Sequence, residues 1–278
     1  MGSIEVNGTT LYYELRGEGP TVLFISGATG DAGHWTEVAD ALADEFTVLT
    51  YDRRANSRSP RPKGWTAAPM DEQGDDAAEL LTALDLAPAV AYGNSSGAMI
   101  LTSLALRHPE VLRGAVLHEP PFAAVAPGGR AAGAELQVLV EQGMAEGGPP
   151  AAMERFLRWV LGDEAFESLD DELRARMLGN AEVFFGLELP DVMSYLPTEE
   201  ELAEVRVPCV VAAGKDNSDP AAKHHWFSEA GRWLADRLDA PFLETPGAHV
   251  PQVTHPRALA EVLRPILRKP PESTRAEA

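Results

Sequence analysis

Short apolar runs alternate with amphipathic helical patterns along most of this chain, and this alternation limits its fold more than any other feature. Seven runs predict strands, over Thr10–Leu15, Thr21–Ser26, Phe46–Tyr51, Ala89–Tyr92, Gly114–His118, Val207–Ala213 and Pro241–Glu244. The patterns between and after them predict helices over Trp35–Asp44, Asp71–Leu86, Gly97–Arg107, Ala221–Leu238 and Pro256–Leu267. Strands separated by helices predict an α/β fold, in which a mostly parallel sheet has helices on both faces.

The alternation breaks between residues 123 and 204. This stretch holds only helical patterns, over Ala131–Met144, Ala151–Leu161 and Glu172–Phe185. An all-helical insertion is typical of a cap, because α/β folds place substrate-binding elements after the carboxyl ends of their strands. We therefore predict a core of residues 1–124 and 203–278, a helical cap of residues 125–202, and a disordered tail over residues 269–278.

The chain is strongly acidic, and this narrows the partners that it can have. It carries 23 basic and 43 acidic side chains, for a formal net charge of −20. Nucleic acids and anionic membranes require basic surfaces, so neither is an expected partner, and a small-molecule substrate is the expected ligand. Residues 127–204 alone carry 17 acidic and 5 basic side chains. We expect this charge on the cap to disfavour anionic substrates.

Motifs that would imply a cofactor, a metal or a membrane are missing from the sequence. The single cysteine excludes an internal disulfide and a cysteine-rich metal site, and the histidines lack the spacing of metal ligands. Neither a P-loop nor a G-x-G-x-x-G motif is present, so no cofactor is expected. No signal peptide and no apolar stretch of membrane-spanning length are visible, which favours a cytoplasmic location. The oligomeric state is left open.

A pentapeptide with the pattern G-x-S-x-G, Gly93–Gly97, lies between a predicted strand and a predicted helix. There the pattern is typical of a nucleophile elbow, a tight turn that exposes a serine hydroxyl at a strand end. The glycines relieve crowding in the turn, and of the two serines only Ser95 has glycine at both required positions. The alternative is an ordinary Gly-Ser turn. The strand and helix on either side favour Ser95 as a nucleophile.

A serine nucleophile requires a base, and His249 is the predicted one. It lies between the last predicted strand and the closing helix. Other histidines are less suitable: His108 and His255 precede prolines at helix junctions, and His224 and His225 lie in a helix that is predicted to be exposed.

The Gly93–Gly97 pentapeptide and His249 carry a resemblance to a known family: the chain resembles the α/β-hydrolase superfamily over nearly its whole length. Three further stretches support the resemblance: Ser26–Gly30 in the place of the oxyanion loop, Tyr51–Ser59 in the place of a D-x-R-G-x-G-x-S stretch, and Arg107–Val111 after the nucleophile helix. Its Tyr-Asp-Arg-Arg and His-Glu-Pro-Pro blocks, residues 51–54 and 118–121, are similar to those of actinobacterial serine hydrolases. The resemblance implies the α/β-hydrolase fold with an eight-stranded sheet, and an oxyanion hole formed by the amides of Ala28 and Ser96. Ser26 and Ala55 depart from the usual His and Gly, but the oxyanion donors are backbone amides.

The resemblance leaves the acid of the catalytic triad open. In most of the superfamily it lies in a G-x-x-D turn after the cap, but that position is Asn217 here, which carries no charge. The favoured acid is Glu119, at the end of the strand after the nucleophile helix, a placement similar to that in some haloalkane dehalogenases. A carboxylate at the end of an apolar strand is costly unless it is paired. Asp216 is the second candidate and Asp219 the third.

The resemblance and the serine nucleophile together imply a serine hydrolase. We expect it to cleave an ester, lactone or related carbonyl bond of a small, largely apolar substrate through an acyl-enzyme, and the actinobacterial likeness favours a role in secondary metabolism. The predicted substrate contacts are Phe122, Asn180, Phe184, Glu188 and Val250; the middle three share one helical face. The alternatives are a cofactor-free oxygenase, a lyase or an acyltransferase on the same fold, or an inactive ligand-binding homologue.

Overall fold

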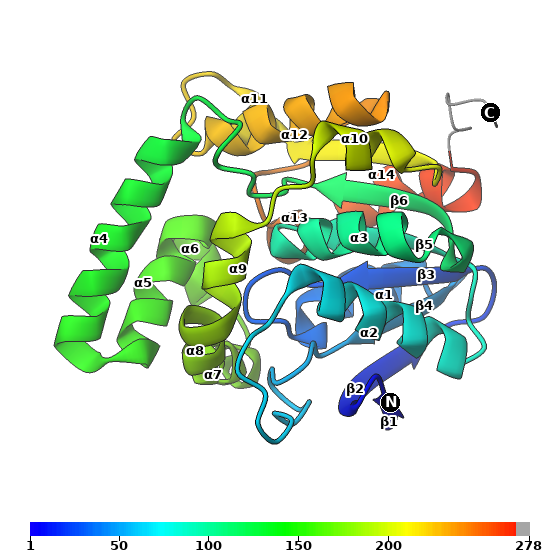
Figure 1. Ribbon diagram of the computed structural model, residues 1–278, viewed down its shortest axis with the longest axis horizontal. Coiled ribbons are helices and arrows are strands. Elements are labelled where there is room, and N and C mark those ends of the chain that lie inside the picture. Colours follow the sequence, from blue (N-terminus) through cyan, green and yellow to red (C-terminus); the bar gives the residue numbers. More distant parts are fainter. Residues whose placement is uncertain (271–278) are drawn as a thin grey trace.

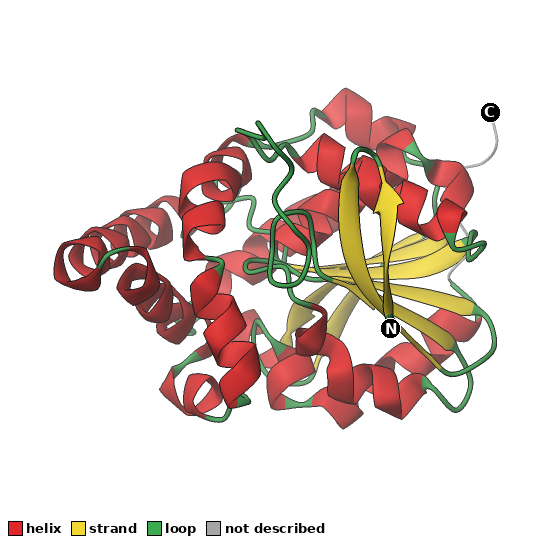
Figure 2. Ribbon diagram, turned by 90° about the horizontal axis from the view of Figure 1, so that it is seen from below, coloured by secondary structure: helices red, strands yellow, loops and turns green. Residues whose placement is uncertain are grey.

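The fold is built around one sheet of eight strands. In the computed structural model, which describes residues 1–270, the strand order is β1-β2-β4-β3-β5-β6-β7-β8. The strands are β1 (Gly2–Val6), β2 (Thr9–Arg16), β3 (Thr21–Ile25), β4 (Thr47–Tyr51), β5 (Ala89–Asn94), β6 (Leu112–His118), β7 (Cys209–Gly214) and β8 (Phe242–Thr245). Helices cover both faces of the sheet (Figures 1 and 2). The expected α/β class and eight-stranded sheet are confirmed.

The first strand has no counterpart among the seven predicted runs. β1 pairs antiparallel with β2, and Val6 lies opposite Thr9, so only Asn7 and Gly8 form the turn between them. Their φ angles are 44° and 69°. Asn-Gly favours such two-residue turns because both residues tolerate positive φ, so this dipeptide was the signal for the hairpin. β2 is antiparallel to β4 as well, and the remaining pairs are parallel.

Alternating side chains of the central strands supply two separate apolar layers. On β3, Leu23 and Ile25 pack in one layer, while Val22 and Phe24 pack in the other. The first layer includes residues of α2 (Met70–Ala83), α3 (Ser96–Arg107) and α12 (His225–Leu238), and the second includes residues of α1 (Thr36–Leu42) and α14 (Pro256–Arg268). Because both faces of β3 are buried, its sequence is continuously apolar rather than alternating.

The predicted helices of the core are present, with shifted ends. The helix expected from Trp35 is preceded by the 3-10 turn η1 (Ala32–Trp35), and the helix expected from Ala221 begins only at His225. Three short elements complete the core: η2 (Pro109–Val111), α11 (Lys215–Ser218) and α13 (Pro251–Thr254). Within residues 1–270, no helix is long and apolar enough to cross a membrane.

Between β6 and β7 the chain forms helices and no strand. They are α4 (Gly129–Gly147), α5 (Pro149–Leu161), α6 (Asp163–Glu167), α7 (Asp171–Gly179), α8 (Ala181–Val183), η3 (Phe184–Glu188), α9 (Leu189–Ser194) and α10 (Glu199–Glu204). Those from α4 to α9 lie together beyond one end of the sheet, whereas α10 packs on the core beside α3 and α12 (Figure 1). We call residues 129–204 the cap. The single helix expected over Glu172–Phe185 is interrupted at Asn180, and η3 is a π-helical turn. The predicted tail, residues 269–278, lies mostly outside the described residues.

Candidate active site

A sharp turn at the end of β5 presents Ser95. This residue has φ 59° and ψ −130° and directly precedes α3, a conformation that is strained for any residue with a side chain. Glycine is required on both sides of it. A Cβ at Gly93 would lie 2.3 Å from the Gly97 carbonyl oxygen, and a Cβ at Gly97 would lie 2.3 Å from the Ile25 carbonyl oxygen. The pentapeptide therefore has the geometry of a nucleophile elbow, and Ser95 is partly exposed while its neighbours are buried.

His249 and Glu119 meet beside this turn. Nδ1 of His249 lies 2.6 Å from Oε2 of Glu119, and both side chains are buried. An ionised carboxylate only accepts hydrogen bonds, so Nδ1 donates and Nε2 is left as a base. Asn94 holds the histidine backbone through a 2.8 Å bond to its carbonyl oxygen. The ring of Phe227 stacks on the imidazole with 3.9 Å between centroids.

The surroundings of Glu119 favour its charged form. The Gly214 amide donates to Oε1 at 2.8 Å, and the Asn217 side chain donates to both oxygens at 3.1 and 3.0 Å. Burial opposes ionisation, but the hydrogen bonds from His249 and the Gly214 amide favour the charged form, and the pKa of Glu119 is held below its ordinary value. Burial also lowers the pKa of the adjacent His118 to about 4, so that side chain is neutral near pH 7.

The other two acid candidates lie elsewhere. Asp216 and Asp219 are both exposed, and Asp219 accepts a hydrogen bond from the Ala221 amide at 2.9 Å. Within residues 1–270, His249 pairs with Glu119 and with neither of these aspartates. Asn217, at the position where the superfamily usually has its acid, instead supports Glu119 through its side-chain amide.

The two amides that were predicted as oxyanion donors lie at the same cavity as Ser95. Ala28 and Ser96 both border the cavity that contains Ser95 and His249. Within the described part of the chain, neither amide donates a hydrogen bond to another protein group. The loop approaches the nucleophile so closely that a Cβ at Gly27 would lie 2.7 Å from the Ser95 Cβ. Paired amides beside a nucleophile are the arrangement that stabilises a tetrahedral oxyanion.

An apolar cavity adjoins Ser95 and is roofed mainly by the cap. Its volume is about 60 Å³, which is room for about four to six water-sized groups. Its apolar walls come from Leu136, Phe156, Trp159, Val160, Phe184, Leu189, Val192, Met193, Trp226 and Phe227. Such a cavity suits a compact apolar group bound next to the Ser95 side chain.

The structure brings only two of the predicted substrate contacts to this space. Phe184 lines the cavity, and Val250 lines an adjoining one that also contains Ser95 and His249. Phe122 lines neither; it is 2% exposed and packs against the rings of Tyr195 and Trp233. It is therefore part of the core rather than of a pocket wall.

Asn180 and Glu188 also line neither cavity, which corrects their expected role as polar substrate contacts. Asn180 donates to the Thr29 carbonyl oxygen at 2.6 Å, and Glu188 forms a buried ion pair with Arg53 at 2.8 Å. The helical face on which they lie does point toward the core. The side chains of Asn180 and Glu188 on this face bind loops of the core, because a buried polar side chain is costly unless it is paired. The partner Arg53 was missed, although it lies in the motif stretch Tyr51–Ser59.

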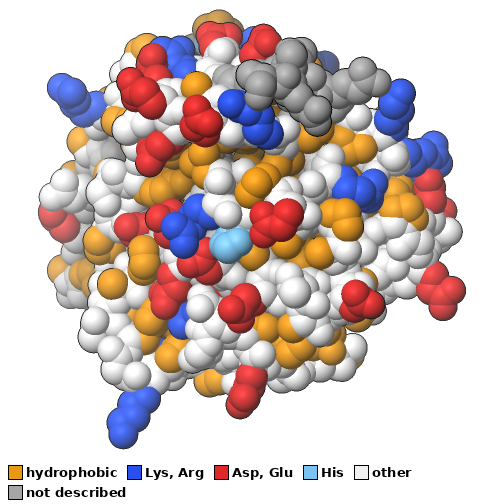
Figure 3. Space-filling model, turned by 45° about the vertical axis from the view of Figure 1, so that its right-hand side comes forward, with side chains coloured by type: hydrophobic (Ala, Val, Ile, Leu, Met, Phe, Trp, Pro, Cys, Tyr) orange, Lys and Arg blue, Asp and Glu red, His pale blue; other side chains and the backbone are white. Residues whose placement is uncertain are grey.

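Some acidic side chains of the cap are paired locally, but the net charge of residues 127–204 stays strongly negative. Arg158 alone pairs with Glu154 at 2.9 Å and Asp163 at 3.1 Å, and it also contacts Glu167. Figure 3 brings forward the side of the molecule away from the cap helices α4 and α5, and there acidic and basic side chains lie among apolar ones. Within residues 1–270, no group of three or more His, Cys, Asp or Glu side chains is placed to hold a metal ion.

Comparison with known proteins agrees with the fold. The family model for the alpha/beta hydrolase fold matches residues 20–256. An uncharacterized hydrolase of Bacillus subtilis (strain 168), YraK, is 30% identical over 278 residues, which cover 98% of each chain. Two solved structures share the fold, each at 20% identity and a TM-score of 0.76. One is a thermophilic esterase from Thermogutta terrifontis, aligned over 97% of this chain and 99% of the esterase. The other is an enol-lactonase from Burkholderia xenovorans LB400, aligned over 96% of this chain and 100% of the lactonase. The chain therefore belongs to the alpha/beta hydrolase fold family.

Proposed function

We propose that the protein hydrolyses small, largely apolar esters or lactones through an acyl-enzyme on Ser95. The observation that carries the proposal is the convergence of three groups at one apolar cavity. These are a serine on a strained elbow, a histidine that a buried glutamate orients, and two amides with no protein acceptor. Each group has a defined part in acyl transfer. Stability of the fold alone does not require the three groups to meet at one cavity.

The steps follow from the positions of these groups. Ser95 Oγ attacks the carbonyl carbon while His249 Nε2 takes its proton, and Glu119 stabilises the imidazolium that forms. The amides of Ala28 and Ser96 bind the developing oxyanion. The alcohol leaves with the proton from His249, and the acyl group stays on Ser95. Water, deprotonated by the same imidazole, then attacks the acyl-enzyme and releases the acid.

The cavity supports a limit on the acyl group. At about 60 Å³ it accepts a short chain or small ring, and a longer chain must displace Phe184 or other cap side chains. A lactone meets the same limit, because its ring carries both acyl and alkoxy parts. The apolar walls favour substrates with no charge near the scissile bond.

An ester and lactone panel tests the proposal. Neutral nitrophenyl esters of increasing acyl length, and small lactones, are assayed with the wild type, with Ser95→Ala, and with the control Ser3→Ala in β1. We expect kcat/KM to be highest for short chains, to be unchanged in the control, and to be abolished in Ser95→Ala. Equal turnover by wild type and Ser95→Ala would overturn the proposal, and so would turnover only with an added acceptor alcohol or with oxygen.

A further inference from the structure

We propose that the cap assembles the oxyanion hole: Glu188, acting through Arg53, holds the Gly27 carbonyl so that the Ala28 amide faces Ser95. The inference rests on the proposed function and adds two positioning residues to it. Neither side chain lines the cavity, so neither is placed to touch a substrate. Their effect on the reaction passes through the loop that contains Gly27.

Arg53 links the cap to this loop through a fully buried cluster. Nη1 and Nη2 donate to the two oxygens of Glu188 at 2.9 and 2.8 Å, and Nη2 also donates to the Gly27 carbonyl oxygen at 2.8 Å. Asn56 donates to the same carboxylate at 2.7 Å. A two-pronged contact fixes the plane of a guanidinium group, because its donors have a rigid geometry. Gln73 of α2 also accepts from Nη1, so Glu188 and Gln73 together orient the Arg53 side chain toward the Gly27 carbonyl oxygen.

The hydrogen bond from Arg53 to the Gly27 carbonyl oxygen determines the direction of the Ala28 N–H. A peptide bond is planar and trans, so the N–H of Ala28 points opposite to the carbonyl of Gly27. Arg53 holds that carbonyl away from the cavity, whereas Ala28 borders the cavity beside Ser95. Rotation of this one peptide unit would turn the oxyanion donor away from the reacting carbon without moving Ser95 or His249.

The loop needs support from outside because its own backbone is strained. Thr29 and Gly30 have φ angles of 70° and 46°, and the left-handed region is unfavourable for threonine. The internal turn bond, from the Gly30 amide to the Gly27 carbonyl, is 3.1 Å long. The cap adds a second contact here, through the 2.6 Å bond from Asn180 to the Thr29 carbonyl. Strained backbone persists only where surrounding contacts hold it.

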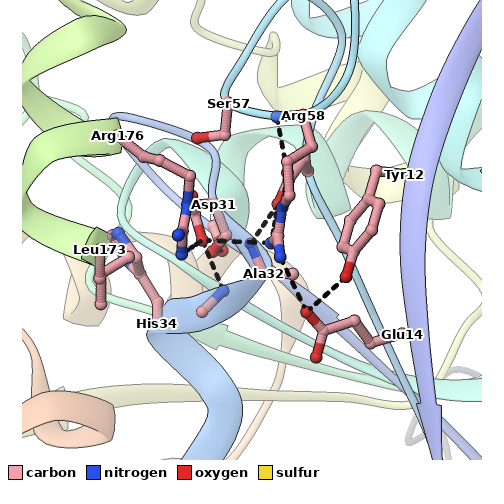
Figure 4. Close-up of polar contacts among 12 residues, drawn as sticks. Tyr12, Glu14, Asp31, Ala32, His34, Ser57, Arg58, Leu173 and Arg176 are labelled. Carbon is pink, nitrogen blue, oxygen red and sulfur yellow. Dashed lines mark hydrogen bonds and ion pairs between the residues drawn. The ribbon is translucent and has the colours of Figure 1, made fainter. Parts of the chain in front are cut away.

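Two other ion pairs provide matched controls. Figure 4 shows Arg176 of α7 reaching Asp31, with Nε 2.6 Å from Oδ2; this pair also joins the cap to the core but does not contact Gly27 or Ala28. Arg54 and Asp76 form a pair as buried as that of Arg53 and Glu188, but without the cap. If the Glu188 pair only added stability, all three pairs would behave alike.

The test measures kcat and KM for a short neutral ester, and Ki for a trifluoromethyl ketone, which forms a tetrahedral alkoxide on the serine. The variants are Glu188→Gln and Arg53→Lys, with Arg176→Gln and Asp76→Asn as controls. Titration with a fluorophosphonate counts the folded sites in each sample, so all rates refer to competent protein. Asn56→Ala, which removes one donor to Glu188, provides a milder change if Glu188→Gln does not fold.

For Glu188→Gln and Arg53→Lys, we expect kcat to fall by about 10- to 100-fold, because a small misplacement of a catalytic group costs this much. KM should stay nearly constant, Ki for the ketone should rise by the same factor as kcat falls, and the controls should keep both values. The inference is overturned if kcat is kept, if the loss appears in KM alone, or if the controls lose as much. A wild type that hydrolyses nothing and takes no adduct on Ser95 overturns the proposed function itself; normal turnover in both test variants overturns only the role of Glu188 and Arg53.

Discussion

Replacing Glu119 by glutamine should disable His249, because an amide cannot satisfy the donors that surround this position. Gly214 donates to one oxygen, His249 to the other, and Asn217 to both. A glutamine has one oxygen and one NH2 group. If the NH2 group faces His249, the imidazole must accept at Nδ1 and carry its proton on Nε2, which removes the base. If it faces Gly214, a buried amide loses its acceptor and the imidazolium loses its counter-charge.

The magnitude follows from these two outcomes. Loss of the correct tautomer in a serine–histidine–acid triad lowers kcat by about 10⁴-fold. The alternative orientation leaves a buried donor unpaired, at a cost of about 1–3 kcal/mol. We therefore expect Glu119→Gln to lower kcat by about 10³- to 10⁴-fold, or about 4–5.5 kcal/mol of barrier. Asp216→Asn should have little effect, because that side chain is exposed and the acid beside His249 is Glu119.

The assay is steady-state hydrolysis of one short neutral ester by wild type, Glu119→Gln and Asp216→Asn. Circular dichroism and thermal melting confirm that each variant is folded. The reasoning is refuted if Glu119→Gln keeps kcat within about tenfold of wild type, since one tenfold step is only about 1.4 kcal/mol. It is equally refuted if Asp216→Asn loses as much activity as Glu119→Gln.

Three further predictions follow from a close contact, a buried histidine and the charge of the cap. Gly27→Ala should abolish hydrolysis, because its Cβ would lie 2.7 Å from the Ser95 Cβ; unchanged kcat/KM in a folded variant would contradict this. Burial lowers the pKa of His118 from 6.5 to about 4. Between these pH values the unfolded chain binds a proton at this residue and the folded chain does not. The free energy of unfolding should therefore fall by about 3 kcal/mol between pH 6.5 and 4. Denaturant unfolding across this range checks it, and His118→Phe, which cannot titrate, should flatten the curve; an equally steep curve in that variant would count against the assignment. Finally, the acidic cap should make a carboxylate-bearing ester slower than its neutral isostere at low ionic strength, with the difference shrinking as salt is added; faster turnover of the anionic ester at low salt would disprove it.

The local parts of the site could be predicted because short-range sterics determine them. Gly93 is required by contacts within the turn itself and Gly97 by the neighbouring strand β3, and the alternation of strands and helices indicates where that turn lies. Glu119 could be preferred as the acid because a carboxylate at the end of an apolar strand needs a partner. The structure supplies that partner in His249, 130 residues further along the chain.

The long-range contacts of the cap could not be predicted in the same way. Asn180, Phe184 and Glu188 were expected on one helical face, but periodicity says only that they share a face and not which core groups they meet. The partner of Glu188 lies 135 residues away, on the loop after β4. The π-helical turn of η3 is a further local irregularity that no simple period predicts. Phe122 was misplaced for a related reason: its neighbours Tyr195 and Trp233 come from segments far along the chain.

The most direct test of the central claim is to identify the residue that a fluorophosphonate modifies. Such a reagent phosphonylates an activated serine, and intact-protein mass spectrometry with peptide mapping locates the adduct. We predict one adduct per chain on the peptide that contains Ser95, formed rapidly in wild type, slowly in Glu119→Gln and not at all in Ser95→Ala. No adduct on wild type, or an undiminished adduct on Ser95→Ala, would contradict a serine hydrolase centred on Ser95.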